Sequence, residues 1–458
     1  MTFKFNTTQR KVEKINTKYR FINSKLPSKG YLKNFRQIKE IESRSMHGQI
    51  PILWKKAIDY SIYDDCKNKW IDFTSTIFVA NIGHSNKRLK KYILDTLNKN
   101  LISSYNYLND LRVQYISKLL KTTKGHFQKA FLLSAGTETT EVAFKLMKSY
   151  GQTVSSNKKI ILSFKGNWHG RTMGAQLLSS NQVQKKWIDK NKNIIYLNFP
   201  YPGLFKGSDP IKFIKREFSY LKKNNISLHK NVCGVMMESF QGWGAYFYPK
   251  EIVKYIREVT YKNDILLAFD EMQAGFGRTG KFFGYENYDI VPDLVCIGKG
   301  MGGGLPISGV LGSKKILDIP DIGSMSSTHS ANPLCCAAGL AVLDEIKNKD
   351  LVNQAKLKGK EMHRILNIIK NKHINIIESI EGKGLIAAII FKKNKNYLNL
   401  IGQVVEKCFE KGLLLVFTGR ESIKIGPPLT ISISALKEGL KVLDKVICEI
   451  SKKNDEIQ

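Results

Sequence analysis

Short apolar runs alternate with amphipathic segments through the middle of the chain, and this alternation restricts the fold more than any other feature. The β-rich runs are AFLLS (130–134), KIILSF (159–164), VCGVMME (232–238), ILLAFDE (265–271) and DLVCIG (293–298). Helical patterns such as ETTEVAFKLMKSYG and PKEIVKYIREVTYKN lie between them. Near-continuous apolar strands separated by amphipathic helices are typical of a parallel or mixed sheet with both faces covered. The sequence therefore predicts an α/β fold.

Ligands of such sheets bind beyond the carboxyl ends of the strands, so the residues after each run are candidates for a site. Gly136 and Thr137 lie between the first run and a helix, whose first backbone N–H groups could bind a phosphate; a simple turn is the alternative. After the second run, Trp168 could stack on a flat ring or pack in the core, and Arg171 could bind a carboxylate or form a surface ion pair. His169 is expected to be a structural, hydrogen-bonded histidine.

The fourth run ends in a carboxylate, Asp270, which follows five apolar residues and should lie at the buried end of a central strand. A buried carboxylate is costly unless it has a partner. A cationic ring nitrogen of a bound group or the guanidinium of Arg278 could be that partner. The amide of Gln273, three residues further on, could reach an adjacent ring oxygen.

A lysine, Lys299, follows the fifth run and lies among five glycines within seven residues. A GxxxxGK[ST] phosphate loop is excluded, because Asp293 stands at the first glycine position and Gly300 at the Ser/Thr position. The segment GKGMGG matches GxGxxG, but no helical pattern follows it, as a dinucleotide site requires. The remaining interpretation is an amine that forms a Schiff base with an aldehyde, since small neighbours leave space for a bulky cofactor.

The amino-acid composition limits the kinds of protein to which this chain can belong. With 458 residues and 42% hydrophobic content, the chain can bury a large core. No apolar run reaches the roughly 18 residues of a membrane span, and the N-terminus lacks the apolar stretch of a secretory signal. The seven cysteines form no CxxC pair, so neither a disulfide framework nor a metal site is predicted. We expect a cytoplasmic protein without membrane contact.

The net charge is large, since 73 basic and 39 acidic residues give +34. Such a charge suggests a hypothesis from a different class of function, namely that the protein binds nucleic acid. The lysines are spread through segments rich in Asn and Ile, however, rather than gathered with aromatic residues in one motif, and nucleic acid is therefore not the expected partner. Residues 1–39 carry eleven Lys or Arg against Glu13 alone, which predicts a solvated or partly ordered basic arm.

Several long motifs resemble, in the right order, those of class III aminotransferases, which are pyridoxal-phosphate enzymes of fold type I. The match covers roughly residues 45–435. The motifs are WIDFTSTIFVANIGH, LLSAGTETTEVAFKL, NWHGRTMGA, FDEMQAGFGRTGKFFGYE, PDLVCIGKGMGGGLPISGV, STHSANPLCCAAGLAVL and GLLLVFTGRESIKIGPPLTIS. The resemblance implies a large domain with a mainly parallel central sheet and a smaller α/β domain built from both chain ends.

The resemblance also implies catalytic and cofactor-binding roles. Lys299 would form the Schiff base with pyridoxal 5'-phosphate and then carry the proton between substrate and cofactor. Asp270 would keep the pyridine nitrogen protonated, which makes the ring an electron sink. Trp168 would stack on the ring face, and Gln273 would approach the phenolic oxygen.

Two further roles concern the phosphate of the cofactor. Gly136 and Thr137 would bind it, and Thr328 would bind the phosphate of the neighbouring subunit's cofactor. That last role implies a homodimer with shared active sites.

Two departures from the family pattern bear on the substrate. Where EPxQGE is common, this chain reads ESFQGW, so that Trp243 replaces a glutamate that pairs with an arginine in relatives acting on ornithine-like or 4-aminobutyrate-like donors. The segment SIKIGPPL places Lys424 where those relatives have the arginine. An indole near Arg171 suggests a pocket for a larger or less charged donor, while Arg171 could still bind the carboxylate of a 2-oxo acid.

The predicted function is transfer of an amino group from a terminal (omega) amine donor to a 2-oxo acid such as 2-oxoglutarate or pyruvate. An aminomutase or a decarboxylase on the same fold is the alternative among enzymes, and a non-catalytic scaffold that binds nucleic acid or a protein partner is the alternative of another class. The predicted parts are a basic arm (1–39), an N-terminal segment of the small domain (40–85), the large cofactor-binding domain (86–330) and the C-terminal small domain (331–458).

Overall fold

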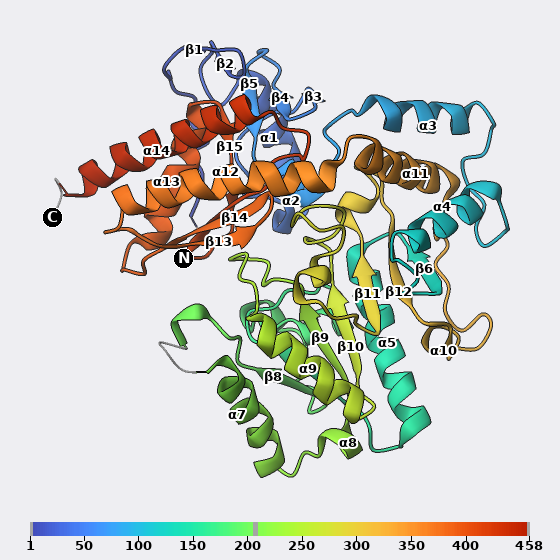
Figure 1. Cartoon of the computed structure of the whole chain (residues 1–458). Coiled ribbons are helices and arrows are strands. Elements are labelled where there is room, and N and C mark those ends of the chain that lie inside the picture. Colours follow the sequence, from blue (N-terminus) through green and yellow to red (C-terminus); the bar gives the residue numbers. More distant parts are fainter. Residues whose placement is uncertain (1–2, 205–208, 456–458) are drawn as a thin grey trace. The chain divides into compact units, whose positions relative to one another are not determined.

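The computed structural model describes residues 3–204 and 209–455, and within them the chain forms two compact units (Figure 1). The larger unit consists of Lys87–Gly242 and Tyr246–Val352. The smaller unit consists of the residues up to Asn86, the segment Trp243–Ala245 and the residues from Asn353 onward. Each unit has its own sheets and is described by itself.

In the part of the chain that the structure describes, the larger unit contains one sheet of seven strands, called the central sheet below, in the order β6-β12-β11-β10-β9-β7-β8. Its strands are β6 Lys129–Leu133, β7 Ile160–Phe164, β8 Ile194–Leu197, β9 Val232–Glu238, β10 Leu266–Asp270, β11 Leu294–Ile297 and β12 Ser308–Gly312. Adjacent strands from β8 to β11 pair in parallel, and β12 is antiparallel to both its neighbours. The predicted α/β fold with a mainly parallel central sheet is confirmed.

Helices cover both faces of the central sheet because its strands are apolar on both sides. On one face, Ala268 and Cys296 join a buried cluster with Leu146 and Met147 of α5 (Gly136–Val154). The alternate residues of β10 face the opposite way, where Phe269 contacts the ring of Tyr288, and α9 (Lys250–Lys262) packs on that side of β10, in front of the strands in Figure 1. These are the amphipathic segments that the sequence pattern predicts.

Helix α11 (Pro333–Asn348) marks the end of the larger unit. It packs on α3 (Lys87–Leu97) and α4 (Asp110–Lys121), which belong to the same unit. The division between the units therefore falls after Val352, whereas the sequence placed the domain boundary at residue 331.

The smaller unit is built from both ends of the chain. Among its described residues, one sheet has the order β1-β2-β5-β4-β3 with β15 beside β5, and a second has the order β13-β14-β17-β16. Their strands are β1 Ile15–Asn16, β2 Phe21–Ile22, β3 Lys56–Ile58, β4 Ser61–Tyr63, β5 Lys69–Asp72, β13 Ile377–Lys383, β14 Ile386–Phe391, β15 Leu413–Leu414, β16 Val416–Phe417 and β17 Ser422–Ile425.

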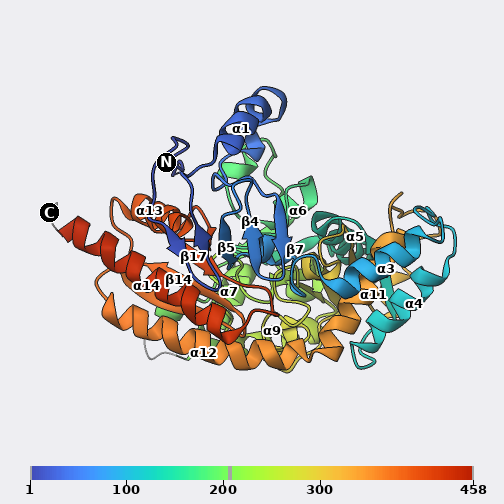
Figure 2. The ribbon, with the colours of Figure 1, turned by 90° about the horizontal axis from the view of Figure 1, so that it is seen from above.

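The long helices of the smaller unit pack in parallel layers. Helices α12 (Leu351–Lys372) and α14 (Ile433–Asp455) lie side by side in Figures 1 and 2, and ion pairs join Lys372 to Asp444 and Lys437 to Glu361. In the part of the chain that is described, none of the helices combines the length and apolar character that crossing a bilayer requires.

The basic segment 1–39 contributes β1, β2 and most of α1 (Lys29–Ile41) to the smaller unit. Ile22 and Leu26 of this segment are buried against Trp70. The helix α1 itself has no buried residue, but Arg10 and Arg20 form partly buried ion pairs with Glu410 and Glu438. The described part of the segment is therefore folded onto the unit through both apolar side chains and ion pairs.

A buried lysine offers a test of the central sheet. Lys158 is fully buried, and its ammonium donates hydrogen bonds to the carbonyls of Val232 (2.9 Å) and Asn263 (2.6 Å). Lys158→Met keeps the apolar stem but leaves these carbonyls without that donor, so we expect the free energy of unfolding to fall by about 1–3 kcal/mol. Urea denaturation measures the loss. The matched variant Lys159→Met changes an exposed neighbour and should cost less than about 0.5 kcal/mol; equal losses in the two variants would contradict this role of Lys158.

Candidate active site

The register of the parallel strands brings polar side chains to one edge of the central sheet. Asp270, the last residue of β10, pairs with Glu238 at the end of β9 on one side and with Cys296 of β11 on the other. Because the strands run in the same direction, the loops that follow them leave the sheet at the same edge. A cavity of about 220 Å³ lies there.

Half of the residues that line this cavity are ones that the sequence indicates as cofactor-binding or catalytic. They are Gly136, Thr137, Trp168, Asp270, Gln273 and Lys299. Five different loops or strand ends supply them, and all belong to the larger unit. The structure thus brings together in one cavity residues that are spread over more than 160 positions of the sequence.

Lys299 occupies an unusual backbone conformation at this edge. It follows β11 and opens a short 3₁₀ turn with φ at +46°, in the left-handed region that side chains other than glycine rarely adopt. A Cβ on Gly298 would lie 2.7 Å from the sulfur of Met272, and one on Gly302 would lie 2.2 Å from the carbonyl oxygen of Leu305. Two of the surrounding glycines therefore allow the tight turn that directs Lys299 into the cavity.

Burial lowers the pKa of the Lys299 amine, while the nearby carboxylates of Asp270 and Glu238 act in the opposite direction. The free-energy cost of removing the ammonium from water exceeds the electrostatic stabilisation that these two carboxylates give it. The neutral amine is therefore favoured relative to that of an exposed lysine. A neutral amine can attack a carbonyl group, which a protonated one cannot.

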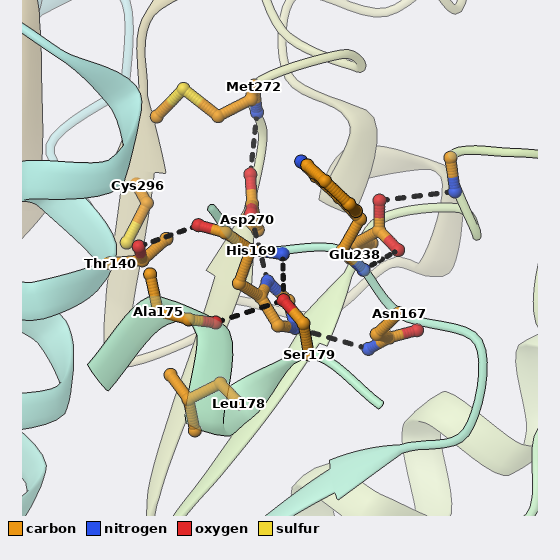
Figure 3. Close-up of polar contacts among 12 residues, drawn as sticks. Thr140, Asn167, His169, Ala175, Leu178, Ser179, Glu238, Asp270, Met272 and Cys296 are labelled. Carbon is orange, nitrogen blue, oxygen red and sulfur yellow. Dashed lines mark hydrogen bonds and ion pairs between the residues drawn. The ribbon is translucent and has the colours of Figure 1, made fainter. Parts of the chain in front are cut away.

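Asp270 is held by one group from the loop after β7 and by one from the turn that follows Asp270 itself, as Figure 3 shows. Its Oδ2 lies 2.9 Å from Nδ1 of His169, and its Oδ1 accepts a hydrogen bond from the backbone N–H of Met272 at 3.0 Å. On the far side of the imidazole, Nε2 lies 3.3 Å from the amide nitrogen of Asn167. Because that amide nitrogen can only donate, Nε2 accepts, and Nδ1 carries the proton that is donated to Asp270.

The backbone of His169 is also fixed at both of its polar atoms. Its N–H donates to the hydroxyl oxygen of Ser179 at 2.8 Å, and its carbonyl accepts from the hydroxyl of Thr140 at 2.8 Å (Figure 3). The sequence analysis expects a structural, hydrogen-bonded histidine here. The structure shows that the group it supports is Asp270, so His169 belongs to the site.

Glu238 is a cavity residue that the sequence analysis missed. One carboxylate oxygen accepts from the backbone N–H of Trp168 and the other from that of Gly242, both at 3.1 Å (Figure 3). It therefore ties together the two loops that follow β7 and β9. The signal was present in the sequence, because Glu238 ends an apolar run just as Asp270 does.

The first turn of α5 faces the cavity through Gly136 and Thr137. The carboxylate of Glu138 already accepts from the N–H groups of Ser134 and Ala135. No hydrogen bond is recorded, within the described residues, for the N–H groups of Gly136 and Thr137. Unpaired N–H groups at the positive end of a helix form a site for an anion such as phosphate.

The remaining predicted residues lie outside this cavity. The exposed guanidinium of Arg171 lies 4.8 Å from the ring centroid of Trp168, at the side of the loop that carries both. Thr328 is exposed in the segment that precedes α11.

Trp243 is part of the smaller unit. Its carbonyl accepts from the hydroxyl of Ser422 at 2.6 Å, and the guanidinium of Arg420 lies 3.7 Å from its ring centroid. The buried ammonium of Lys424, on the same strand as Ser422, lies 4.8 Å from the ring of Phe78. The two positions that depart from the family pattern therefore lie among aromatic and basic groups.

Comparison with known proteins identifies the family. The family model described as aminotransferase class-III matches residues 43–447. An acetylornithine aminotransferase of Prochlorococcus marinus subsp. pastoris is 34% identical over 412 residues, which are 87% of this chain and 92% of the relative. One from Caldanaerobacter subterraneus is 31% identical over 411 residues, 88% of this chain and 96% of the relative.

The chain belongs to the class III aminotransferases. Its fold agrees with solved structures of such enzymes. An aminotransferase of Bacillus anthracis superposes with a TM-score of 0.84 at 23% identity, over 93% of this chain and all of that one. The ornithine aminotransferase of Toxoplasma gondii gives a TM-score of 0.83 at 21% identity, over 93% and 97% of the two chains. As a class III aminotransferase, the protein uses pyridoxal 5'-phosphate.

The residues of this class III aminotransferase fit that cofactor. The cavity offers N–H groups for an anion at one end, at α5, and a carboxylate that can accept a hydrogen bond from a protonated ring nitrogen, at Asp270. It also contains Lys299, whose lowered amine pKa suits the attack on an aldehyde. An indole, an amide and an amine thus surround a space for a flat ring.

The lowered pKa of Lys299 predicts how stability depends on pH. In protein free of cofactor, the unfolded chain binds a proton at Lys299 up to the ordinary value of 10.5, whereas the folded chain releases it at lower pH. Between these two pH values the unfolded state binds more protons, so the wild-type stability rises with pH. Lys299→Met removes the buried amine and should raise the free energy of unfolding by about 1 kcal/mol or more near pH 7.

Urea denaturation near pH 7 and again near pH 9.5 measures this difference, which should shrink as the pH rises. Lys315→Met, at an exposed position, serves as the control and should show no such trend. A gain that stays constant or grows between the two pH values would contradict the lowered pKa of Lys299.

Proposed function

We propose that this aminotransferase moves an amino group from the terminal amine of a donor to a 2-oxo acid such as 2-oxoglutarate or pyruvate, at the cavity beside Asp270 and Lys299. The observation that supports the proposal most directly is that these two side chains line the same cavity. The cofactor binds the amino group and its ring stores the electron pair left when a proton leaves the substrate carbon.

Lys299 and Asp270 have the catalytic roles. Lys299 would hold the cofactor through its amine and would carry the proton at the substrate carbon, since a base with a lowered pKa suits proton transfer near neutral pH. Asp270 keeps the ring nitrogen protonated, and His169 holds Asp270 in position from the opposite side through Nδ1.

Other cavity residues bind the cofactor. Trp168 stacks on the ring, with its backbone held by Glu238. Gln273 approaches the phenolic oxygen. Gly136 and Thr137 bind the phosphate through their N–H groups.

The donor we propose is a diamino acid whose second amine is acylated. The relatives named above are acetylornithine aminotransferases, and their substrate, compared with ornithine, is larger and lacks one positive charge. The replacement of a glutamate by Trp243 removes a negative charge, which agrees with a donor that carries less positive charge. Arg171 binds the carboxylate of the 2-oxo acid, because an exposed guanidinium can form two parallel hydrogen bonds with a carboxylate.

We further propose a homodimer in which Thr328 binds the phosphate of the partner's cofactor. Apolar side chains that are unusually exposed in the larger unit support it, notably Tyr107 (78% exposed), Leu108 (82%) and Ile322, which is fully exposed a few residues before Thr328. A second copy of the chain would remove such side chains from water. A cytoplasmic location completes the proposal and rests on the sequence alone.

A donor and acceptor panel tests the function. The purified protein, loaded with pyridoxal 5'-phosphate, is incubated with N-acetylornithine, ornithine or 4-aminobutyrate, with and without 2-oxoglutarate or pyruvate, and products are separated by chromatography. We expect transfer only when a 2-oxo acid is present, and faster transfer from N-acetylornithine than from ornithine. Without a 2-oxo acid, at most one product per active site is expected, and product beyond that amount would instead indicate an aminomutase or a decarboxylase.

Variants of the two catalytic residues provide the companion test. Lys299→Ala and Asp270→Asn should each reduce kcat by at least about 100-fold, because each removes a group that acts on the proton or on the ring nitrogen. The matched control Lys315→Met should retain the parental rate. Turnover by Lys299→Ala at the parental rate would contradict the assignment, and absence of turnover in every protein, the parent included, would favour a non-catalytic scaffold.

A further inference from the structure

The loop that carries Arg171 is fitted onto the beginning of α5 by two glycines. A Cβ on Gly170, whose φ is +138°, would lie 2.3 Å from the hydroxyl oxygen of Thr137. A Cβ on Gly174 would lie 2.2 Å from a carboxylate oxygen of Glu141. Both glycines thus make room for oxygen-bearing side chains of α5, one turn apart.

Hydrogen bonds connect the same groups. The hydroxyl oxygens of Thr137 and Thr172 are 2.6 Å apart, and the hydroxyl of Thr172 donates to Oε1 of Glu141. The same Oε1 accepts from the backbone N–H of Ala175 at 3.0 Å. Thr172 stands at the N-cap position of α6 (Met173–Leu178) without capping that helix through its own side chain. Glu141 of α5 instead accepts the hydrogen bond from the backbone N–H of Ala175, in the first turn of α6.

The chemistry of these groups gives the chain of hydroxyls one direction. An ionised carboxylate only accepts, so the single hydroxyl proton of Thr172 points to Glu141. The Thr172 oxygen is then left to accept from the hydroxyl of Thr137. The hydroxyl proton of Thr137 is thereby directed to Thr172, which fixes this side chain at the anion-binding end of α5 and leaves the backbone N–H of Thr137 for the phosphate.

We propose that Glu141 is a positioning residue that aligns Thr137 for the cofactor phosphate and holds the loop of Trp168 and Arg171 against α5. This inference rests on the proposed function, since it takes the phosphate to bind at Gly136 and Thr137. Glu141 itself does not line the cavity. It reaches Thr137 through the hydroxyl of Thr172, and it holds the loop through Thr172 and the backbone N–H of Ala175.

The direct test compares two ligands that differ only in the phosphate. Binding of pyridoxal 5'-phosphate and of pyridoxal to the protein freed of cofactor is measured by fluorescence titration for the parent and for Glu141→Ala. We expect the dissociation constant of pyridoxal 5'-phosphate to rise about tenfold or more, the loss of a well-placed hydrogen bond to a charged group, with that of pyridoxal unchanged. The removal of a negative charge near the phosphate would by itself act in the opposite direction.

Glu141→Gln is the matched control. Both hydrogen bonds converge on one oxygen of Glu141, and the amide oxygen of glutamine can accept both. Its affinity for pyridoxal 5'-phosphate should therefore stay within about threefold of the parent. A loss in Glu141→Gln as large as that in Glu141→Ala would show that charge rather than placement matters and would overturn the proposal.

A double-mutant cycle tests whether Glu141 acts through Thr137. Thr137→Ala alone should weaken binding of pyridoxal 5'-phosphate, and adding Glu141→Ala to it should cause little further loss, because the group that Glu141 aligns is already missing. Fully multiplicative losses in the double variant would contradict the coupling. Gly174→Ala, which pushes the carboxylate away without removing it, should weaken phosphate-dependent binding as Glu141→Ala does, and it replaces that variant if the latter does not fold.

The outcomes separate this inference from the proposed function. If the parent binds pyridoxal 5'-phosphate no more tightly than pyridoxal, the phosphate site at α5 is wrong and the proposed function loses its support there. If the parent prefers the phosphorylated ligand and Glu141→Ala keeps the same preference, the proposed function stands and only the role of Glu141 is refuted.

Discussion

The interaction on which the site depends is the hydrogen bond between His169 and Asp270 at the end of β10. It satisfies a carboxylate that would otherwise be costly to bury, and both residues line the cavity. The imidazole is itself fixed at the ring and at the backbone, by Asn167, Ser179 and Thr140. The direction of the Asp270 carboxylate is therefore set before a cofactor binds, as preorganised catalysis requires.

The sheet and its loops supply the rest of the site around that carboxylate. Parallel pairing places Glu238 level with Asp270, and Glu238 in turn holds the loop of Trp168 by a single backbone contact. Lys299 enters the same space from the next strand in a strained conformation that its glycine neighbours make possible. Strain of this kind persists only when the surrounding structure determines it, and here it directs an amine into the cavity.

The sequence predicted the strongest parts of this arrangement because they carry local signals. A carboxylate after five apolar residues and a lysine among glycines after the next strand stand out without any structure. Glu238 carried the same signal as Asp270 and was overlooked. The partnership of His169 with Asp270 joins residues 101 positions apart and depends on how a loop folds back, so no local pattern reveals it. Glu141 reads as an ordinary acidic residue of an amphipathic helix, and only the close approach of Gly174 distinguishes it. The short strands of the smaller unit, several of two or three residues, have no alternation to detect.

The central claim is that the cofactor is attached to one particular amine. Reduction of the purified enzyme with borohydride fixes a bound aldehyde permanently to the amine that holds it, and digestion followed by peptide mass spectrometry locates the added pyridoxyl group. The account predicts the added mass on the peptide that contains residue 299, in amounts close to one per chain. A modification spread over several surface lysines, or concentrated on a different one, would contradict it.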